Sequence, residues 1–297
     1  MTQHLISATK AHRYPRMALG AAGVAGLLLV TACAPQENQN ASDESPVQES
    51  SFAHVHGMAV DPETDQLLVA THNGLFTVEE GTVEQVGPVN DLMGFAADSE
   101  GRYYASGHPG PGSDLPNPVG LIESNDGGKT WQELSRQGES DFHAMAVSEE
   151  GVIGFDGTLR ISVNGQEWTE AGDQIQPANL AALPDSPVVL ATTQEGVQRS
   201  EDGGYTWTLP KDAPVLLMTA FADADTAVGV APDGEVHISR DAGLSWEATG
   251  GTVTEPGAIT AAPGDEDVRI WIATAEGVEF SDDSGASFST LVEAGEN

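Results

Sequence analysis

Histidine is the residue type in this chain whose placement points most directly to chemistry. The chain has eight histidines, and five of them lie beside short apolar segments: His54, His56, His72, His108 and His143. Imidazole is a common ligand of zinc, copper, iron and nickel. The grouping therefore indicates a site for one transition metal ion, copper or zinc. Two alternatives remain open, which are an acid–base or sugar-binding site and a purely structural role.

Methionines accompany these residues at a regular spacing. Met58 and Met145 each follow a histidine by two positions, and Met93 follows Asp91 by two positions. Residues at positions i and i+2 of a strand share one face. Thioether sulfur is a soft ligand that shifts metal preference towards copper(I). The three methionines are therefore further candidate ligands.

Three carboxylates lie in the same part of the chain and suggest a different chemistry. Asp91 and Asp141 precede apolar segments, and Asp156 follows one in Phe-Asp-Gly. Two carboxylates are the minimum for acid–base hydrolysis of a glycosidic bond. A glycoside hydrolase that uses Asp91, Asp141 and Asp156 is therefore the alternative to a ligand-binding protein.

The elements that must position these groups are repeated. Six segments combine small and apolar residues in the same way, at 56–60, 93–97, 143–147, 179–183, 217–221 and 258–262. Each is followed by a polar turn and a second short apolar run, with no helical periodicity. Repeats of about 35 to 50 residues are typical of propellers and solenoids. The six segments are predicted to be the innermost strands of six blades.

A second repeated feature has the frame Ser-x-Asp-x-Gly-x-Thr/Ser-aromatic. It occupies residues 124–131, 200–207, 239–246 and, in weaker form, 281–288, with a shortened version at 162–168. An aspartate in a tight turn accepts backbone N–H bonds, and glycine supplies positive φ. The sequence therefore predicts structural turns at Asp126, Asp202, Asp241 and Asp283, with Trp131, Trp207 and Trp246 packed between blades.

This frame resembles the BNR or Asp-box repeat family, which includes bacterial sialidases, sortilin-type receptors and photosystem II assembly factors. The resemblance implies an all-β propeller of four-stranded blades, six in this chain. It does not imply one activity, because boxes occur in catalysts and in binding scaffolds. The arginine-rich pattern of sialidases is missing, since no Phe/Tyr-Arg-Ile-Pro segment occurs near the start of the fold.

The strand order of such a blade sorts residues between two ends. First-strand starts and the links from second to third strands share one end, where the five histidines fall. We call it the histidine rim. The opposite end, the box rim, carries the hairpins with the Asp boxes. Aligned starts in the last three blades hold Asn179, Leu217 and Ala258, so the histidines concentrate on the first three blades. The proline-rich link 107–120 is expected to lie over them as a lid.

The amino-terminal part has the pattern of an export signal. Basic residues precede an apolar run, and Val-Thr-Ala-Cys ending at Cys33 resembles a bacterial lipobox. Residues 1–32 are therefore predicted to be a lipoprotein signal peptide, and Cys33 the lipidated residue. Residues 33–51 are expected to form a disordered acidic and polar tether, and residues 52–297 are expected to form the Asp-box β-propeller. The protein is expected on the outer face of the bacterial cytoplasmic membrane, anchored by the lipid.

Composition limits the partners. The formal net charge is −35, which argues against binding nucleic acid. Cys33 is the only cysteine, so no intrachain disulfide can form. About 245 residues with 39% hydrophobic content over the whole chain suit a single domain with a sizeable core. We expect a monomer, whose ligand is a metal, a carbohydrate or a protein.

Overall fold

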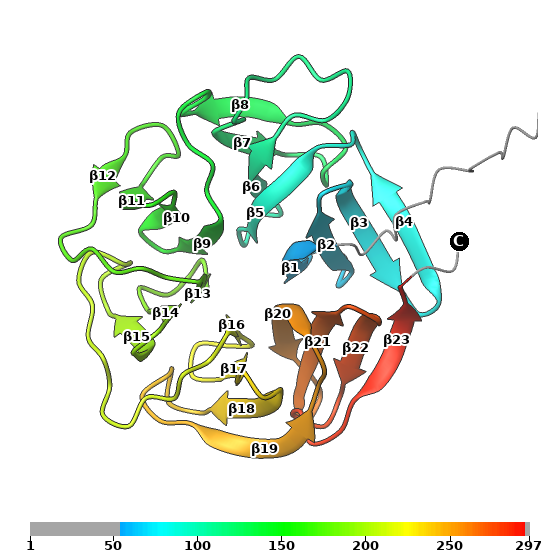
Figure 1. Cartoon of the computed structure of the whole chain (residues 1–297), viewed down its shortest axis with the longest axis vertical. Helices are drawn as coiled ribbons and strands as arrows, with labels where there is room; N and C mark the ends of the chain where they lie inside the picture. The colour runs from blue at the N-terminus through cyan, green and yellow to red at the C-terminus, as the bar shows by residue number, and fades with distance from the viewer. Residues whose placement is uncertain (1–53, 295–297) are drawn as a thin grey trace, which may run out of the picture. The chain divides into compact units, whose positions relative to one another are not determined.

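Residues 54–294, which a computed structural model describes, form a ring of six β-sheets, a six-bladed β-propeller (Figure 1). The predicted all-β class and the number of blades are confirmed. This part of the chain offers no helix with the length and apolar character that crossing a membrane requires. The predicted signal peptide, Cys33 and the tether lie outside the described residues, as do residues 52–53 and 295–297 of the predicted propeller domain.

Each blade is a meander of consecutive antiparallel strands. The first three blades contain β1 (Val55–Val60), β2 (Leu67–Thr71), β3 (Gly74–Glu79), β4 (Thr82–Val86), β5 (Asp91–Ala97), β6 (Tyr103–His108), β7 (Leu121–Ser124), β8 (Gln132–Ser135), β9 (Ala144–Ser148), β10 (Gly151–Phe155), β11 (Leu159–Ser162) and β12 (Thr169–Glu170). The last three contain β13 (Asn179–Ala182), β14 (Val189–Thr193), β15 (Gly196–Ser200), β16 (Met218–Phe221), β17 (Ala227–Val230), β18 (Glu235–Ser239), β19 (Glu247–Thr252), β20 (Pro256–Pro263), β21 (Val268–Thr274), β22 (Gly277–Ser281) and β23 (Ser289–Glu293).

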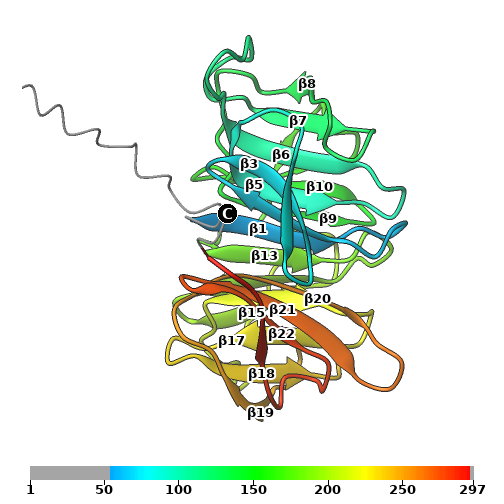
Figure 2. The same cartoon turned by 90° about the vertical axis from the view of Figure 1, so that its right-hand side faces the viewer.

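The first strand of each blade lies at the centre of the ring (Figure 1). These strands, β1, β5, β9, β13, β16 and β20, correspond to the six predicted segments. Figure 2 shows β1 and β13 running through the thickness of the ring. Successive strands are antiparallel, so the hairpin after a third strand lies at the end opposite the start of the first. The topology thus separates the histidine rim from the box rim.

Small residues allow the inner strands to approach closely. Gly94 in β5 is an example, because a Cβ atom at this position would lie 2.3 Å from the carbonyl oxygen of Phe142, just before β9. A real Cβ atom cannot approach another heavy atom that closely, so this position requires glycine. The small-apolar pattern that reveals the repeats therefore has a packing cause at the centre of the ring.

The ring closes through side chains and loops at the junction of the first and sixth blades. In residues 54–294 each sheet is built from consecutive strands, without a strand exchanged between the two blades. The Arg269 guanidinium bonds both carboxylate oxygens of Asp65 at 2.8 Å, and the Gly81 N–H donates to the Leu291 carbonyl. Val55 and Val69 of the first blade share one hydrophobic cluster with residues of the sixth.

The fourth blade departs from the predicted four strands. Its sheet contains only β13, β14 and β15, and the expected fourth strand is reduced to an isolated bridge between Arg199 and Thr208. Pro210 follows two residues later and has no N–H to donate to a ladder. The proline therefore explains why pairing stops after one bridge.

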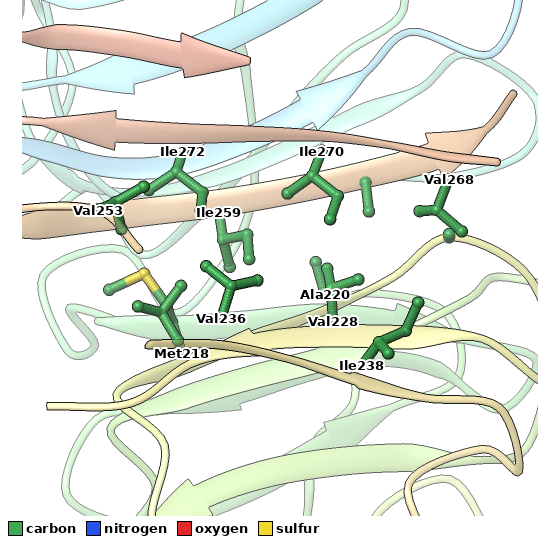
Figure 3. Packing of buried hydrophobic residues seen from close by; sticks show 13 residues of the cluster. Met218, Ala220, Val228, Val236, Ile238, Val253, Ile259, Val268, Ile270 and Ile272 are labelled. Atoms are coloured by element: carbon green, nitrogen blue, oxygen red, sulfur yellow. The ribbon is translucent and has the colours of Figure 1, made fainter. Parts of the chain in front are cut away.

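Hydrophobic side chains fill the spaces between neighbouring blades. Between the fifth and sixth blades, Val236 and Ile238 of β18 lie opposite Ile270 and Ile272 of β21 (Figure 3). Ile270 and Ile272 are fully buried. Burial of such a side chain contributes about 1.5–3 kcal/mol relative to exposure. Packing of this kind at the blade junctions gives a rigid ring on which the rim residues are placed.

The four Asp boxes share one hydrogen-bond pattern. In the first, the Asp126 carboxylate accepts bonds from the Ser124 hydroxyl at 2.9 Å, the Thr130 N–H at 2.9 Å and the Thr130 hydroxyl at 2.6 Å. The Gly128 N–H donates to the Ser124 hydroxyl oxygen. The same arrangement recurs at the other three aspartates, Asp202, Asp241 and Asp283.

The indoles of the boxes lie at blade junctions. Trp131 packs against the cluster that contains Leu68 and Leu75 of the first blade, and Trp246 packs against the cluster that contains Leu190 of the fourth. Trp207 is buried in a cluster with Ile153 of the third blade. Each box therefore closes a hairpin and presents an aromatic ring to the preceding blade.

These hydrogen bonds predict a loss of stability in acid. The side-chain bond from Thr130 to Asp126, and that from Ser287 to Asp283, lower the pKa of each carboxyl from 3.8 to about 2. The unfolded chain therefore takes up protons first, so this stabilisation is full above pH 3.8 and is lost as the pH falls towards 2. Across this pH range the free energy of unfolding, measured with urea, should fall less steeply with decreasing pH in Asp126→Asn than in the parent protein. An equally steep fall in this variant would contradict the stabilising role of the Asp126 carboxylate.

Candidate functional site

The site lies at the mouth of a central channel with a volume of about 560 Å³. The inner strands of all six blades line it. His56 and His143 contribute at the histidine rim, whereas Asp61 and Asp65 contribute from the turn after β1 at the other end. The walls between carry small and apolar side chains. The titratable side chains therefore lie at the two ends of the channel, with small and apolar residues prominent between them.

His56, His72 and Asp91 form the tightest group. The Nε2 atoms of His56 and His72 are 3.2 Å apart, and His72 Nδ1 lies 2.6 Å from Asp91 Oδ1. His56 belongs to β1, His72 follows β2, and Asp91 begins β5 of the next blade. All three side chains are partly buried, and one potential ligand atom from each lies within 4.8 Å of the others. The structure thus brings together three of the predicted site residues.

A β-bulge helps to place His56. In the ladder between β1 and β2, Val55 pairs with Thr71 and Gly57 pairs with Ala70, so His56 is the extra residue. Bulges redirect side chains and are frequent beside functional sites. Strict alternation along the strand does not hold here, and the periodicity of the sequence alone could not give the direction of His56.

The environment of His56 favours its neutral form. Burial is the largest cause that lowers its pKa to about 4, and the charge of His72 lowers it further, while Asp91 acts in the opposite sense. His54 and His143 also lower it. A neutral imidazole has a free lone pair, which is the form that binds a metal.

The hydrogen bond to Asp91 determines the tautomer of His72. A carboxylate only accepts, so Nδ1 of His72 carries the proton that it donates to Asp91. In the neutral ring, the Nε2 lone pair then faces His56 Nε2. Two nitrogen ligands on a tetrahedral zinc ion lie about 3.3 Å apart, given Zn–N distances of about 2.05 Å. The observed 3.2 Å separation matches that spacing.

His54 lies beside this group. Its ring centroid is 5.1 Å from that of His72 in an edge-on arrangement. The residue is exposed and has a φ of 59°, in the left-handed region that non-glycine residues rarely adopt. His54 can therefore supply a further nitrogen at the open side of the site.

The two remaining histidines surround another carboxylate. Asp141 Oδ2 lies 3.2 Å from His108 Nε2 and 3.6 Å from His143 Nε2. His108 is the last residue of β6, and Asp141 and His143 precede β9. The five predicted histidines therefore divide into two groups, each with its own aspartate.

The methionines have surroundings of another kind. Met145 is buried in a hydrophobic cluster with Phe142 and Val147, and Met58 packs against the cluster at the junction of the first and sixth blades. Met93 is a half-buried residue at a bulge of β5. The packing of Met58 and Met145 gives their thioethers a role in the core.

Asp156 belongs to a separate polar network. Its carboxylate accepts a bond from the Ser140 hydroxyl at 2.5 Å and lies 3.8 Å from Arg136 and 3.5 Å from Arg160. Only 11% of its side chain is exposed. The two guanidinium groups hold this carboxylate in an ion pair network of the third blade.

Asn117 is a functional candidate that the sequence did not reveal. Its side-chain oxygen lies 2.7 Å from His108 Nδ1 and orients that ring. The residue lies within the proline-rich link 107–120, which was predicted to cover the histidines. The sequence did contain one signal for this role, an amide side chain in a link close to the clustered histidines. Metal-binding histidines usually donate their second N–H to an oxygen.

Comparisons with known proteins give the fold alone. No protein-family model and no curated protein matches the sequence. A GH74 enzyme of Niastella koreensis superposes with a TM-score of 0.53 at 15% identity, over 80% of this chain and 45% of its own. An ancestral GH74 enzyme gives 0.52 at 13% identity, over 85% and 40%. U3-55K gives 0.50 at 12% identity, over 81% and 82%. This chain therefore spans less than half the length of the two GH74 enzymes and shares with all three structures a β-propeller fold.

Proposed function

We propose that this protein is a ligand-binding propeller of the Asp-box type that binds a divalent transition metal ion, zinc or copper, at its histidine rim. One observation carries the proposal: the Nε2 atoms of His56 and His72 converge to 3.2 Å while Asp91 holds the far side of His72 at 2.6 Å. The shared hydrogen-bond pattern of the four boxes supports membership in the Asp-box repeat family.

The three groups have different roles in this proposal. His56 and His72 bind the ion through Nε2. Asp91 orients His72 and increases the basicity of its ring, as carboxylates commonly do for metal-binding histidines. His54 or a small-molecule ligand completes the coordination at the exposed side. An ion held by only two or three protein groups keeps a position open for such a ligand.

The methionine environment favours a divalent ion over copper(I). Thioethers would select copper(I), but Met58 and Met145 contribute to hydrophobic packing. The polar groups closest to the ion would be imidazole and carboxylate, which suit zinc and copper(II). This changes the preference that the methionine spacing suggested.

A glycoside hydrolase receives less support from the same geometry. Asp156 lies between two arginines, and Asp91 and Asp141 each lie beside an imidazole nitrogen. These contacts give all three carboxylates cationic or histidine partners. Metal binding uses the histidine partner of Asp91 as a ligand, whereas a pair of hydrolytic carboxylates would need to face a sugar ring.

The test is metal content at equilibrium. The purified protein should be stripped with a chelator, dialysed against equimolar Zn²⁺ or Cu²⁺, separated from free metal and measured by elemental mass spectrometry. At least one ion should remain per chain, and excess Mg²⁺ should not displace it, because imidazole is a poor ligand for magnesium. Protein that retains no Zn²⁺ or Cu²⁺ would overturn the proposal.

We also propose that the protein acts at the outer face of the cytoplasmic membrane, attached through a lipid on Cys33. The lipobox-like sequence supports this, and Cys33 lies outside the described residues. Expression with labelled palmitate should label the membrane fraction. Cys33→Ser should abolish the label, and a label that persists in this variant would contradict the anchor.

A further inference from the structure

The link from the fourth to the fifth blade exposes three apolar side chains. Leu209, Val215 and Leu217 are 48%, 47% and 39% exposed. They are three of the six large apolar side chains with this degree of exposure in residues 54–294, and all three lie between β15 and β16. Single exposed apolar residues are common on protein surfaces, whereas a group of them often marks an interaction site. We call these three residues the link patch.

Contacts of the link place this patch at the histidine rim. Gly196 begins β15 in the turn at that rim, and a Cβ atom there would lie 3.3 Å from Leu209 Cδ1 and 3.3 Å from the Pro214 carbonyl oxygen. The carbonyl oxygen of Leu217 accepts a bond from the hydroxyl of Thr192, near the end of β14, at 3.1 Å. Leu217 also lines the central channel. The link patch therefore extends from the fourth blade to the mouth of the channel.

The link is fixed to the fourth blade beneath the patch. Leu216, between Val215 and Leu217, is only 3% exposed and belongs to a hydrophobic cluster with Val197. The Val197 N–H donates to the Pro214 carbonyl at 3.0 Å. Neighbouring side chains of an extended chain point to opposite sides, so the buried Leu216 directs Val215 and Leu217 outward. The apolar surface is formed before a partner arrives, which reduces the entropic cost of binding.

Carboxylates lie on both sides of the link patch. Glu195 lies in the turn between β14 and β15, which Leu209 lies beside. Asp233 lies in the turn that follows Val230, whose carbonyl accepts the Leu217 N–H at 2.8 Å. Both acidic residues are exposed. The patch is therefore bordered by negative charge on the fourth blade and on the fifth.

Most basic side chains of the last three blades lie at the opposite end. Between residues 169 and 294 the basic residues are Arg199, Lys211, Arg240 and Arg269. Arg199 donates to the backbone of the box at 239–246, which contains Arg240, and Arg269 lies near the box-rim start of β21. Lys211 is on the link, but its Nζ lies 3.6 Å from Asp212 Oδ2 in an ion pair. The surroundings of the link patch are therefore negative overall.

We propose that the link patch binds a basic segment of a partner protein, in which apolar side chains are interspersed with lysine or arginine. The apolar side chains cover the patch, and the basic ones face the carboxylates at its border. Protein interfaces commonly combine an apolar centre with a polar rim of complementary charge. The same negative charge disfavours a second copy of this chain and an anionic lipid surface as occupants. The proposal goes beyond metal binding and does not depend on it.

The experiment compares two short synthetic peptides on the same protein. One labelled peptide alternates leucine and lysine, and the other has serine in place of every leucine. Binding to chelator-treated protein is measured by fluorescence anisotropy, so a bound ion has no part in the result. The parent protein should bind the leucine peptide about tenfold more tightly or better, because only this peptide buries apolar surface on the patch.

Matched variants locate the binding. Leu209→Ser/Val215→Ser/Leu217→Ser should lose the preference for the leucine peptide. Val163→Ser/Leu244→Ser removes two exposed apolar side chains at the box rim, 72% and 51% exposed, and should bind both peptides as the parent protein does. Circular dichroism checks the folding of each variant.

The carboxylates are tested separately from the patch. Glu195→Gln/Asp233→Asn should weaken the binding of both peptides and reduce its dependence on salt, while the preference for leucine remains. Equal binding of the two peptides by the parent protein would overturn the proposal, because charge alone would then account for it. A preference that survives in the triple variant, or that is lost equally in the box-rim variant, would also overturn it. These outcomes leave the metal site untouched, since the ion is absent throughout.

Discussion

His56→Ala is expected to weaken Zn²⁺ binding at the site formed by His56 and His72 by more than about 100-fold. The substitution removes one of two imidazole ligands, and loss of an outer partner alone typically costs 10–100-fold in metal affinity. His72→Ala should have a similar effect, because His72 also supplies an Nε2 atom. Isothermal titration calorimetry with Zn²⁺ measures the change. His237→Ala changes a histidine on β18 that lies beside Glu235, and this matched control should bind as the parent protein does.

Asp91→Asn tests the role assigned to the carboxylate within this prediction. The amide retains the size of the side chain and an oxygen that can accept from His72, but it removes the negative charge. An orienting residue should lose about 10–100-fold in affinity, and a direct ligand should lose as much as His56→Ala. Binding by His56→Ala at the parent affinity would contradict a metal site at His56 and His72.

Phe142→Ala is expected to have the largest effect on stability, a loss of about 3–5 kcal/mol in the free energy of unfolding. The Phe142 ring is fully buried and stacks on Trp168 with centroids 4.8 Å apart. It also covers Gly154, where a Cβ atom would lie 2.7 Å from the ring. Removing the ring leaves a cavity at the junction of the second and third blades, which rigid strands cannot close.

Urea denaturation followed by tryptophan fluorescence and circular dichroism measures this loss. Val163→Ala is the control, because Val163 is 72% exposed and its replacement should change the free energy by less than about 0.5 kcal/mol. A Phe142→Ala protein as stable as the control would contradict the packing of this blade junction.

The ring of blades was largely predictable from sequence because each blade repeats the same local requirements. Close approach at the centre demands residues such as Gly94, and box hairpins demand the serine, aspartate and glycine of the frame. These requirements are local and leave a periodic trace. They also sort residues between the rims, which is why histidines distant in sequence could be expected at one end of the ring.

The number of strands in each blade and the geometry of the site depended on contacts that leave no periodic pattern in the sequence. Pro210 shortens the fourth blade through a single missing N–H. The bulge at His56 breaks the alternation of side chains along β1, from which the direction of the His56 side chain was inferred. The ring orientation of His108 depends on Asn117, nine residues away in an irregular link. Spacing could therefore indicate a common rim for the five histidines, but not their division into two groups.

The most direct test of the central claim is the position of a metal in crystals grown with Zn²⁺. Diffraction data collected on both sides of the zinc absorption edge identify an anomalous peak as zinc. The account predicts an anomalous peak within about 2.1 Å of both His56 Nε2 and His72 Nε2, with Asp91 behind His72. Fully occupied zinc elsewhere in the protein, with no peak between these two nitrogens, would contradict it.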